Sequence, residues 1–345
     1  MLEYPTTGCG GAVIQTPLPG KQFVTPPANA QASAKRFYAK AAALHVHWFT
    51  SMQCTHTGHT HVLVPAPQSD GTANFQASYD ISHNWSGYQI YNTAQYTEAG
   101  WTIPAAAKPQ PGYTWTGGYY SSTWTGIGGG AGANLSDPLI QAGTQQDINP
   151  LDGSPPYYFW YEIVGGPTET KDSNGNPSEV MLQSGNCGDC LTANPGDSAG
   201  SVAIWTPTQP GSSLGVVQLG VCDFTAGGCV SFYIGGGQDP DNRPYTPQPG
   251  DSTEWIVEAP AGLGYSYLPL ADFNQVPFTA AVWTDNYVGP GSQSFTINDG
   301  VLPTPIWLLQ TIFGSNQYLA VPSSLGGDGA SFTDHYQQPI RGGNN

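Results

Sequence analysis

The sequence has few charged residues, and basic residues are especially scarce. Its 345 residues include 8 lysines and arginines against 24 aspartates and glutamates, and charged residues make up 9% of the chain. An average globular protein has roughly 25%. Because nucleic-acid binding needs a basic surface, the net charge of −16 argues against a nucleic-acid partner. The small number of charges also limits self-repulsion in acid, so the composition suits an acidic medium.

Familiar catalytic signatures are missing. The sequence contains no phosphate-binding loop and no Asp-Thr-Gly or Asp-Ser-Gly, which argues against nucleotide-binding enzymes and peptidases of the pepsin type. No histidine occurs between His83 and His335, so a Ser-His-Asp triad in this part of the chain is not expected. Carboxylates and amides are the remaining candidates for catalysis.

Long apolar runs are also absent. No run reaches the roughly 18 residues of a transmembrane helix, so we expect no contact with a membrane. The N-terminus lacks the basic and then apolar pattern of a secretory signal peptide. Since the six cysteines favour an oxidising compartment, we expect a secreted, extracellular protein whose signal peptide is not part of this sequence.

Glycine, proline and aromatic residues are abundant and predict a strand-rich fold. The chain has 45 glycines, 31 prolines and 12% aromatic residues, which favours many short strands around a large core. Short apolar or alternating segments predict strands at 201–205, 216–221 and 230–234, and good helix formers predict a helix at 32–44. The segments expected to form long loops are 172–177 and 235–249. This pattern is typical of an antiparallel sandwich.

The even number of cysteines predicts three disulfides. Proximity along the chain favours Cys9 with Cys54, Cys187 with Cys190, and Cys222 with Cys229. Six cysteines allow 15 pairings, so this pairing stays one choice among several. The alternative for the last four cysteines is a zinc site of four thiolates.

Five histidines cluster between residues 45 and 61. They are His45, His47, His56, His59 and His61. Imidazoles at this spacing could bind a transition metal, but they could equally serve as pH-sensitive packing groups or have no special role. We expect neither a metal nor any other cofactor.

Three strands would place polar groups among apolar neighbours. Because side chains alternate between the faces of a strand, Gln141 shares a face with Leu139 and Gly143. By the same rule, the residues that share faces are Glu162 with Tyr158 and Trp160, and Glu254 with Ile256 and Glu258. A carboxylate inside an apolar strand is costly unless it is paired or protonated, so Glu162 and Glu254 are candidates for function. The alternative is that they point to solvent.

Six short motifs occur in a fixed order between residues 84 and 280. They are Asn-Trp-Ser-Gly (84–87), Thr-Trp-Thr-Gly-Ile-Gly-Gly (123–129), Leu-Ile-Gln-Ala-Gly (139–143), Trp-Tyr-Glu (160–162), Thr-Glu-Trp-Ile-Val-Glu (253–258) and Leu-Pro-Leu-Ala-Asp-Phe (268–273). In this order they resemble the eqolisin family of glutamic peptidases. Segments 319–324 and 329–333 look like the end of bacterial members, which extends the resemblance to about residue 336. Residues 1–80 lie outside it.

The resemblance implies the fold, the domains and the partners. The expected fold is all-β, an antiparallel β-sandwich of two curved sheets in a concanavalin-like jelly roll, with a less regular N-terminal extension. We therefore expect an N-terminal, histidine-rich region at 1–80 and a peptidase sandwich at 81–345. One concave sheet would bind a polypeptide substrate in extended conformation, and the protein would be a monomer.

The resemblance also implies a catalytic pair. The family's glutamine falls on Gln141 and its glutamate on Glu254, while Trp85 and Trp124 fall near the substrate cleft. In the implied reaction Glu254 acts as base and then acid on a water, and the Gln141 amide stabilises the oxyanion. The protein would thus be an acid endopeptidase that pepstatin does not inhibit, with Glu162 among its substrate-binding residues.

The sequence departs from the family at two places. Where the family reads Gly-Ile-Asp-Gly, residues 126–129 read Gly-Ile-Gly-Gly, which removes one carboxylate. Gln145 takes the place of a family aspartate, and Asp147 lies two residues further on the same face, so we assign Asp147 to substrate binding. These departures put the specificity and the pH optimum in question.

Other functions stay open from the sequence alone. An aromatic-rich sandwich could bind glycans or peptides without catalysis, and Glu162 with Glu254 could form the acid/base pair of a glycosidase. The N-terminal region 1–80 would either pack against the acidic body near neutral pH and leave once histidines and carboxylates are protonated, as a prosegment does, or merely decorate the sandwich.

Overall fold

The structure is a computed structural model of the 345-residue chain. The residues that it describes are 2–5, 9, 12–16, 36–49, 52–63, 79–109, 117–130, 137–151, 154–183, 191–235, 243–262, 266–285, 295–299, 303–312 and 314–339.

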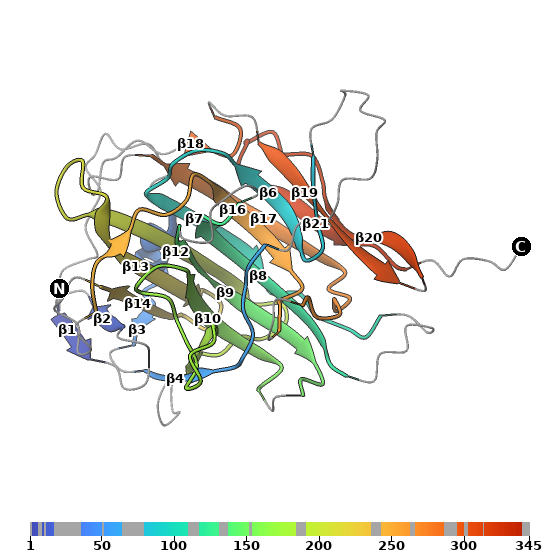
Figure 1. The fold of residues 1–345 in the computed structure, drawn as a ribbon, viewed down its shortest axis with the longest axis horizontal. Coiled ribbons are helices and arrows are strands. Elements are labelled where there is room, and N and C mark those ends of the chain that lie inside the picture. Colours follow the sequence, from blue (N-terminus) through green and yellow to red (C-terminus); the bar gives the residue numbers. More distant parts are fainter. Residues whose placement is uncertain are drawn as a thin grey trace, which may run out of the picture.

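Two β-sheets pack face to face (Figure 1). In order across the first sheet, the strands are β4 (Gln53–His56), β11 (Val180–Gln183), β10 (Tyr157–Val164), β9 (Leu139–Ile148), β8 (Tyr119–Ile127), β16 (Thr253–Glu258), β6 (Trp85–Ile90) and β19 (Thr304–Ile312). In order across the second sheet, they are β21 (Phe332–Tyr336), β17 (Gln275–Thr284), β7 (Tyr96–Thr102), β12 (Ser198–Pro207), β13 (Leu214–Asp223), β14 (Gly228–Ile234), β2 (Val13–Thr16) and β1 (Leu2–Pro5).

Short strands complete and connect the sheets. They are β3 (His47–Trp48) beside β14, β5 (Asp80–Ser82) beside β19, β15 (Thr246–Pro247) beside β13 and β18 (Phe295–Thr296) beside β17. Strand β20 (Ser315–Pro322) pairs with β19 of the first sheet and β21 of the second. Among the described strands only the β3–β14 and β5–β19 pairings are parallel. The expected all-β antiparallel sandwich is therefore confirmed.

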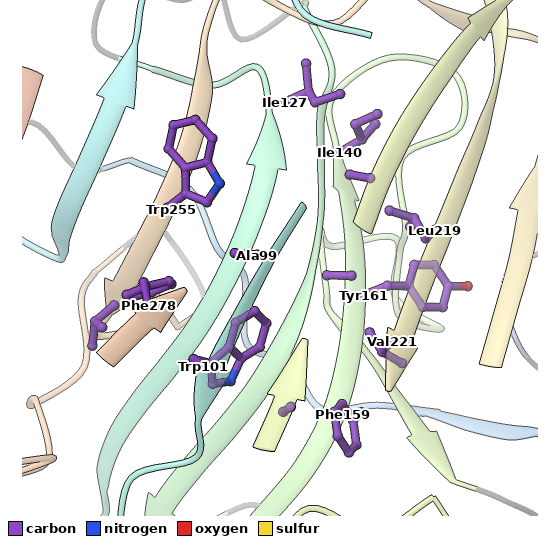
Figure 2. Packing of buried hydrophobic residues seen from close by; sticks show 14 of the residues in the cluster. Ala99, Trp101, Ile127, Ile140, Phe159, Tyr161, Leu219, Val221, Trp255 and Phe278 are labelled. Carbon is purple, nitrogen blue, oxygen red and sulfur yellow. The ribbon is translucent and has the colours of Figure 1, made fainter. Parts of the chain in front are cut away.

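The main core lies between the sheets, where alternate residues of each strand meet. Figure 2 shows Ile127, Ile140 and Trp255 of the first sheet on the side that faces Trp101 and Phe278 of the second. All five are buried. Because these residues alternate with the polar positions of their strands, the core fixes which side chains the first sheet presents on its other face.

The predicted elements agree with the structure where it is described. The predicted strands fall within β12, β13 and β14, and α1 (Arg36–Ala43) falls within the predicted helix, whose residues 32–35 lie outside the described part. Helix α1 covers the outer face of the second sheet, where Phe37 packs against Phe224 with ring centroids 5.7 Å apart. Segment 172–177 forms a turn, and the expected loop at 235–249 contains the short strand β15.

Two of the three expected disulfides are confirmed. Cys9 is bonded to Cys54, and Cys222 is bonded to Cys229 across β13 and β14. The zinc alternative is wrong, because a disulfide leaves Cys222 and Cys229 no thiolates to offer. Residues 187 and 190, the third expected pair, lie outside the described residues.

The first 80 residues contribute strands to both sheets. Strand β4 is an edge strand of the first sheet, next to β11, while β2 and β3 pair with β14 of the second. The Cys9–Cys54 bond ties the two groups of strands together. The division of the chain at residue 80 stays a prediction. Within the described residues, no helix has the length and apolar character that crossing a membrane requires.

Replacing Phe278 by alanine should destabilise the sandwich strongly. Phe278 is buried, stacks on Phe332 and contacts Trp101, so we expect the free energy of unfolding to fall by about 3–5 kcal/mol. Denaturant unfolding measures it. The control is Leu151→Ala, because Leu151 is 74% exposed and its loss should change stability by less than about 0.5 kcal/mol. Equal effects of the two substitutions would contradict this packing.

Candidate active site

The candidate residues lie in one row across the first sheet. Glu254 of β16 is directly opposite Gly126 of β8, Gly126 is opposite Gln141 of β9, and Gln141 is opposite Glu162 of β10. Residues that are directly opposite share a face, and this face points away from the core between the sheets. The sequence predicted that Gln141, Glu162 and Glu254 each share a face with their own strand neighbours, and the structure adds that the strands bring them together.

Gly126 separates the carboxyl group of Glu254 from the amide of Gln141. A Cβ atom at Gly126 would lie 3.0 Å from the Trp124 ring and 3.1 Å from the Gln141 side chain. A larger side chain at this position would therefore crowd both residues. Because residue 126 has no side chain, β8 places no side chain between the carboxyl group and the amide.

Glu254 is fully buried. Burial raises the pKa of Glu254 well above its usual value, against a smaller lowering by the neighbouring Ser252. Neither carboxylate oxygen has a hydrogen-bond partner of good geometry within the described part of the chain. Buried polar groups are normally hydrogen-bonded, so a buried carboxyl group with unused bonding capacity is a candidate for function.

The amide of Gln141 binds a carbonyl group of the chain itself. Its Nε2 donates to the carbonyl oxygen of His61 at 2.7 Å and lies 3.3 Å from Oε2 of Glu162. His61 belongs to a segment that follows β4 and crosses this face of the sheet (Figure 1). Gln141 thus already holds a peptide carbonyl in the way that an oxyanion donor would hold one.

Glu162 binds the same segment. Its two carboxylate oxygens accept hydrogen bonds from the Thr60 hydroxyl and the His61 backbone N–H, both at 2.7 Å. Burial raises the pKa of Glu162 to about 8, although the charge of His61 opposes the rise. Glu162 and Glu254 are both fully buried, so the alternative that they point to solvent is wrong.

The side chain of His61 is enclosed between carboxylates and an indole. It stacks on Trp160 with ring centroids 3.8 Å apart, while Nε2 lies 2.6 Å from Glu179 and Nδ1 lies 3.0 Å from Glu258. We call these residues, Trp160, Glu179 and Glu258, the His61 pocket. Burial alone would lower the pKa of His61, but the charges and hydrogen bonds of Glu258 and Glu179 raise it to about 10.

The two carboxylates of the His61 pocket differ in their ionisation. Burial opposes ionisation of Glu179, but hydrogen bonds and charge from His59 and His61 hold its pKa well below the usual range. For Glu258, burial raises the pKa in spite of the His61 charge. The buried ion pair is therefore His61 with Glu179.

The two predicted tryptophans lie close to this site. Trp124 donates from Nε1 to Glu258 at 2.8 Å, and its ring lies 4.9 Å from that of Trp85. Asp147 is bonded to Gln145 instead, at 2.6 Å. It is six residues from Gln141 on the same strand, about 20 Å along β9, so Asp147 is not brought to the row.

The backbone explains one departure from the family pattern. Gly128 has a φ of 92°, and a Cβ atom there would lie 2.3 Å from the carbonyl oxygen of Pro138. L-residues with side chains rarely adopt this conformation. The aspartate that the family carries at this position therefore does not fit the present backbone.

Three residues of the site were not among the predicted site residues: His61, Glu179 and Glu258. Glu258 carried a signal, because it follows Glu254 by four residues on the same face. Glu179 carried none, since it follows a turn and reaches the site only through the pairing of β10 with β11. His61 was one of five clustered histidines and had nothing in the sequence to distinguish it.

The histidine cluster is dispersed in the structure. His45 and His47 are exposed, His56 is half-buried, and His59 lies 3.5 Å from Glu179 at the edge of the His61 pocket. Within the described ranges, no three histidine, cysteine, aspartate or glutamate side chains are placed to hold a metal ion.

The register also bears on the glycosidase alternative. Glu162 and Glu254 are three strand spacings apart, or about 14 Å between their backbones. Glycosidases keep their two carboxyl groups about 5–10 Å apart. The sheet therefore does not favour this pair as a glycosidase site.

Comparisons with known proteins agree with the sequence motifs. Residues 83–184 match the model of the Peptidase A4 family. This part of the chain is similar to the Peptidase A4 family, the eqolisins. The matched region spans β6 to β11 and includes Gln141, Glu162 and Glu179, while Glu254 lies beyond it. The match supports a peptidase.

One solved structure is also similar. It is the crystal structure of scytalido-glutamic peptidase with a transition state analog inhibitor, which is 18% identical with a TM-score of 0.47 and covers 74% of this chain and 98% of that chain. A search of curated proteins finds no match.

Replacing His61 by glutamine should destabilise the protein in a pH-dependent way. A histidine whose pKa is raised from 6.5 to about 10 contributes stability that is complete below pH 6.5 and is lost as the pH rises toward 10. We expect His61→Gln to lower the free energy of unfolding by about 3–5 kcal/mol near pH 6, and the difference from wild type to shrink above pH 6.5. Denaturant unfolding at several pH values measures it.

His47→Gln is the matched control, because His47 is exposed and its replacement should show no such trend. A His61→Gln effect that stays constant from pH 6 to pH 10 would contradict the ion pair.

Proposed function

We propose that this protein is an acid endopeptidase that uses Gln141 and Glu254. The observation that carries the proposal is the row Glu254, Gly126, Gln141, in which the Gln141 amide holds a peptide carbonyl and the buried Glu254 lies two strand spacings away on the same face. The match to the Peptidase A4 family supports the same reaction.

The proposed reaction needs one titrating group. Ionised Glu254 takes a proton from a water molecule, whose oxygen adds to the carbonyl carbon of the substrate. The Gln141 Nε2 donates to the oxygen that becomes negative. The C–N bond then breaks, and Glu254 returns its proton to the leaving nitrogen. Since glutamine does not titrate, Glu254 carries both proton transfers, and an inhibitor directed at paired aspartates, such as pepstatin, should have no effect.

The substrate would bind in extended conformation. The segment that occupies this face does so: Thr60 and Ala261 exchange backbone hydrogen bonds at 2.9 and 2.8 Å, and the Glu179 N–H donates to the His59 carbonyl at 2.7 Å. Such contacts recognise a polypeptide backbone irrespective of its sequence. The disulfides and the scarcity of charge support secretion into an acidic medium.

Removing either member of the pair should abolish or greatly reduce peptidase activity. We expect Glu254→Gln to leave no measurable turnover, and Gln141→Ala to lower kcat by about 10²–10³ because one oxyanion donor is lost. Hydrolysis of an unfolded protein at acidic pH, with pepstatin and a chelator present, measures both effects.

Gln218→Ala is the matched control, because Gln218 is an amide on β13 of the second sheet and should not affect turnover. Full activity of Glu254→Gln would contradict the proposed pair.

We also propose that the N-terminal region acts as a prosegment through residues 57–62. While this segment lies on the row, a substrate cannot reach Gln141. Four titrating side chains bear on its release: Glu162, Glu179 and Glu258 face His61 from the sheet, and His59 belongs to the segment. His61 keeps its proton up to a pKa of about 10, so protonation of this histidine is not the trigger.

The pH at which the segment would be released follows from the directions in which the pKa values of Glu179 and Glu162 are shifted. Glu179, with its lowered pKa, stabilises the bound segment above pH 4.5, and this contribution is lost as the pH falls further. Glu162, with its raised pKa of about 8, stabilises the bound segment below pH 4.5 and progressively less as the pH rises toward 8. Below pH 4.5 the contribution of Glu162 is constant. The loss of stability of the bound segment in this pH range therefore comes from protonation of Glu179.

Acidification from pH 6 to pH 3 should therefore weaken the binding of residues 57–62. We expect amide hydrogen exchange at His61, after correction for the intrinsic effect of pH, to become at least tenfold faster relative to exchange at Val221 in β13. Mass spectrometry of the same samples shows whether the N-terminus stays attached. Fully active protein in which this segment remains protected would contradict the prosegment.

A further inference from the structure

The two carboxylates of the His61 pocket are held in place by hydrogen bonds from the surrounding structure. Glu179 accepts hydrogen bonds from the Tyr158 and Thr57 hydroxyls at 2.6 Å, and Glu258 accepts them from Trp124 and Asn84 at 2.8 Å. Except for Thr57, these donors lie outside the bound segment, so the sheet orients both carboxylates without help from His61. The two carboxylates and the stacked indole of Trp160 form a site that suits a flat cation.

The backbone of His61 places this pocket relative to the reaction. Gln141 donates to the carbonyl oxygen of His61 at 2.7 Å, so the His61–Val62 peptide bond occupies the position at which the proposed reaction would act. The side chain of His61 belongs to the residue on the acyl side of that bond. The His61 pocket therefore receives the side chain that immediately precedes the bond to be cleaved.

We propose that the His61 pocket is the specificity subsite for the residue on the acyl side of the cleaved bond, and that it selects cationic side chains. In the present structure an internal ligand, the imidazolium of His61, fills it. This assignment rests on the proposed peptidase function for its biological meaning, but the binding of a cation to the pocket does not depend on catalysis.

Electrostatics explain the selection. Both Glu179 and Glu258 are fully buried, and a neutral occupant would leave the negative charge of Glu179 without compensation in a medium of low polarity. An imidazolium, an ammonium or a guanidinium would supply the missing positive charge. A neutral side chain of similar size would fill the space without doing so, and would bind less well.

A cavity variant tests the pocket without catalysis. His61→Gly should leave a cavity that free imidazolium can enter at pH 6, and imidazolium should then raise the Tm of this variant but not that of wild type, whose pocket is filled. Pyrrole is the matched neutral ring. We expect no comparable shift with pyrrole, nor with imidazolium when His61→Gly is combined with Glu179→Gln. Equal shifts with both rings, or no shift with either, would overturn the proposal.

Cleavage-site mapping tests the subsite in the reaction. Wild-type protein after acid incubation should cleave an unfolded protein with His, Lys and Arg enriched roughly tenfold or more on the acyl side. Cleavage without this enrichment would overturn the subsite. Imidazolium binding to His61→Gly with no cleavage of any substrate would overturn the proposed function and uphold the cation pocket, so the two failures can be distinguished.

Discussion

The site depends on the burial of four carboxyl groups on one face of one sheet. Glu162, Glu179, Glu254 and Glu258 are all fully buried, and among the described residues the cation inserted between them is His61. Four ionised carboxylates with one imidazolium would be very costly in a medium of low polarity. The four carboxyl groups therefore differ in their ionisation. Glu179 stays ionised beside His61, while burial favours the protonated form of the other three.

The sandwich makes this arrangement permanent through strand register. A shift of one residue in any strand would move its polar side chains into the core and its core side chains onto the site. Ile127 and Ile140 are directly opposite each other between the sheets, and the same pairing holds Gly126 opposite Gln141. Core packing thus sets the distance between the candidate catalytic groups, and no flexible loop has to place them.

The sequence predicted this site as far as local rules allow. Alternation along single strands put Gln141, Glu162 and Glu254 on faces with the correct neighbours, and the ordered motifs indicated which of them belong together. Alternation could not show that residues 141 and 254 lie two strand spacings apart in one row, because that depends on pairing between distant segments. Nor could it find Glu179, or separate His61 from its neighbours, since both reach the site through tertiary contacts of β4 and β11.

In the proposed prosegment role, residues 57–62 would do more than block the way to Gln141. Glu254 is fully buried, and burial holds its pKa well above the usual value. A protonated carboxyl group cannot take a proton from water, so the closed form lacks a competent base as well as an empty cleft. Departure of the segment would admit water, lower that pKa toward its usual value, and supply the molecule that the base must activate. Under the proposed prosegment role of residues 57–62, opening of the site and activation of the base would therefore be the same event.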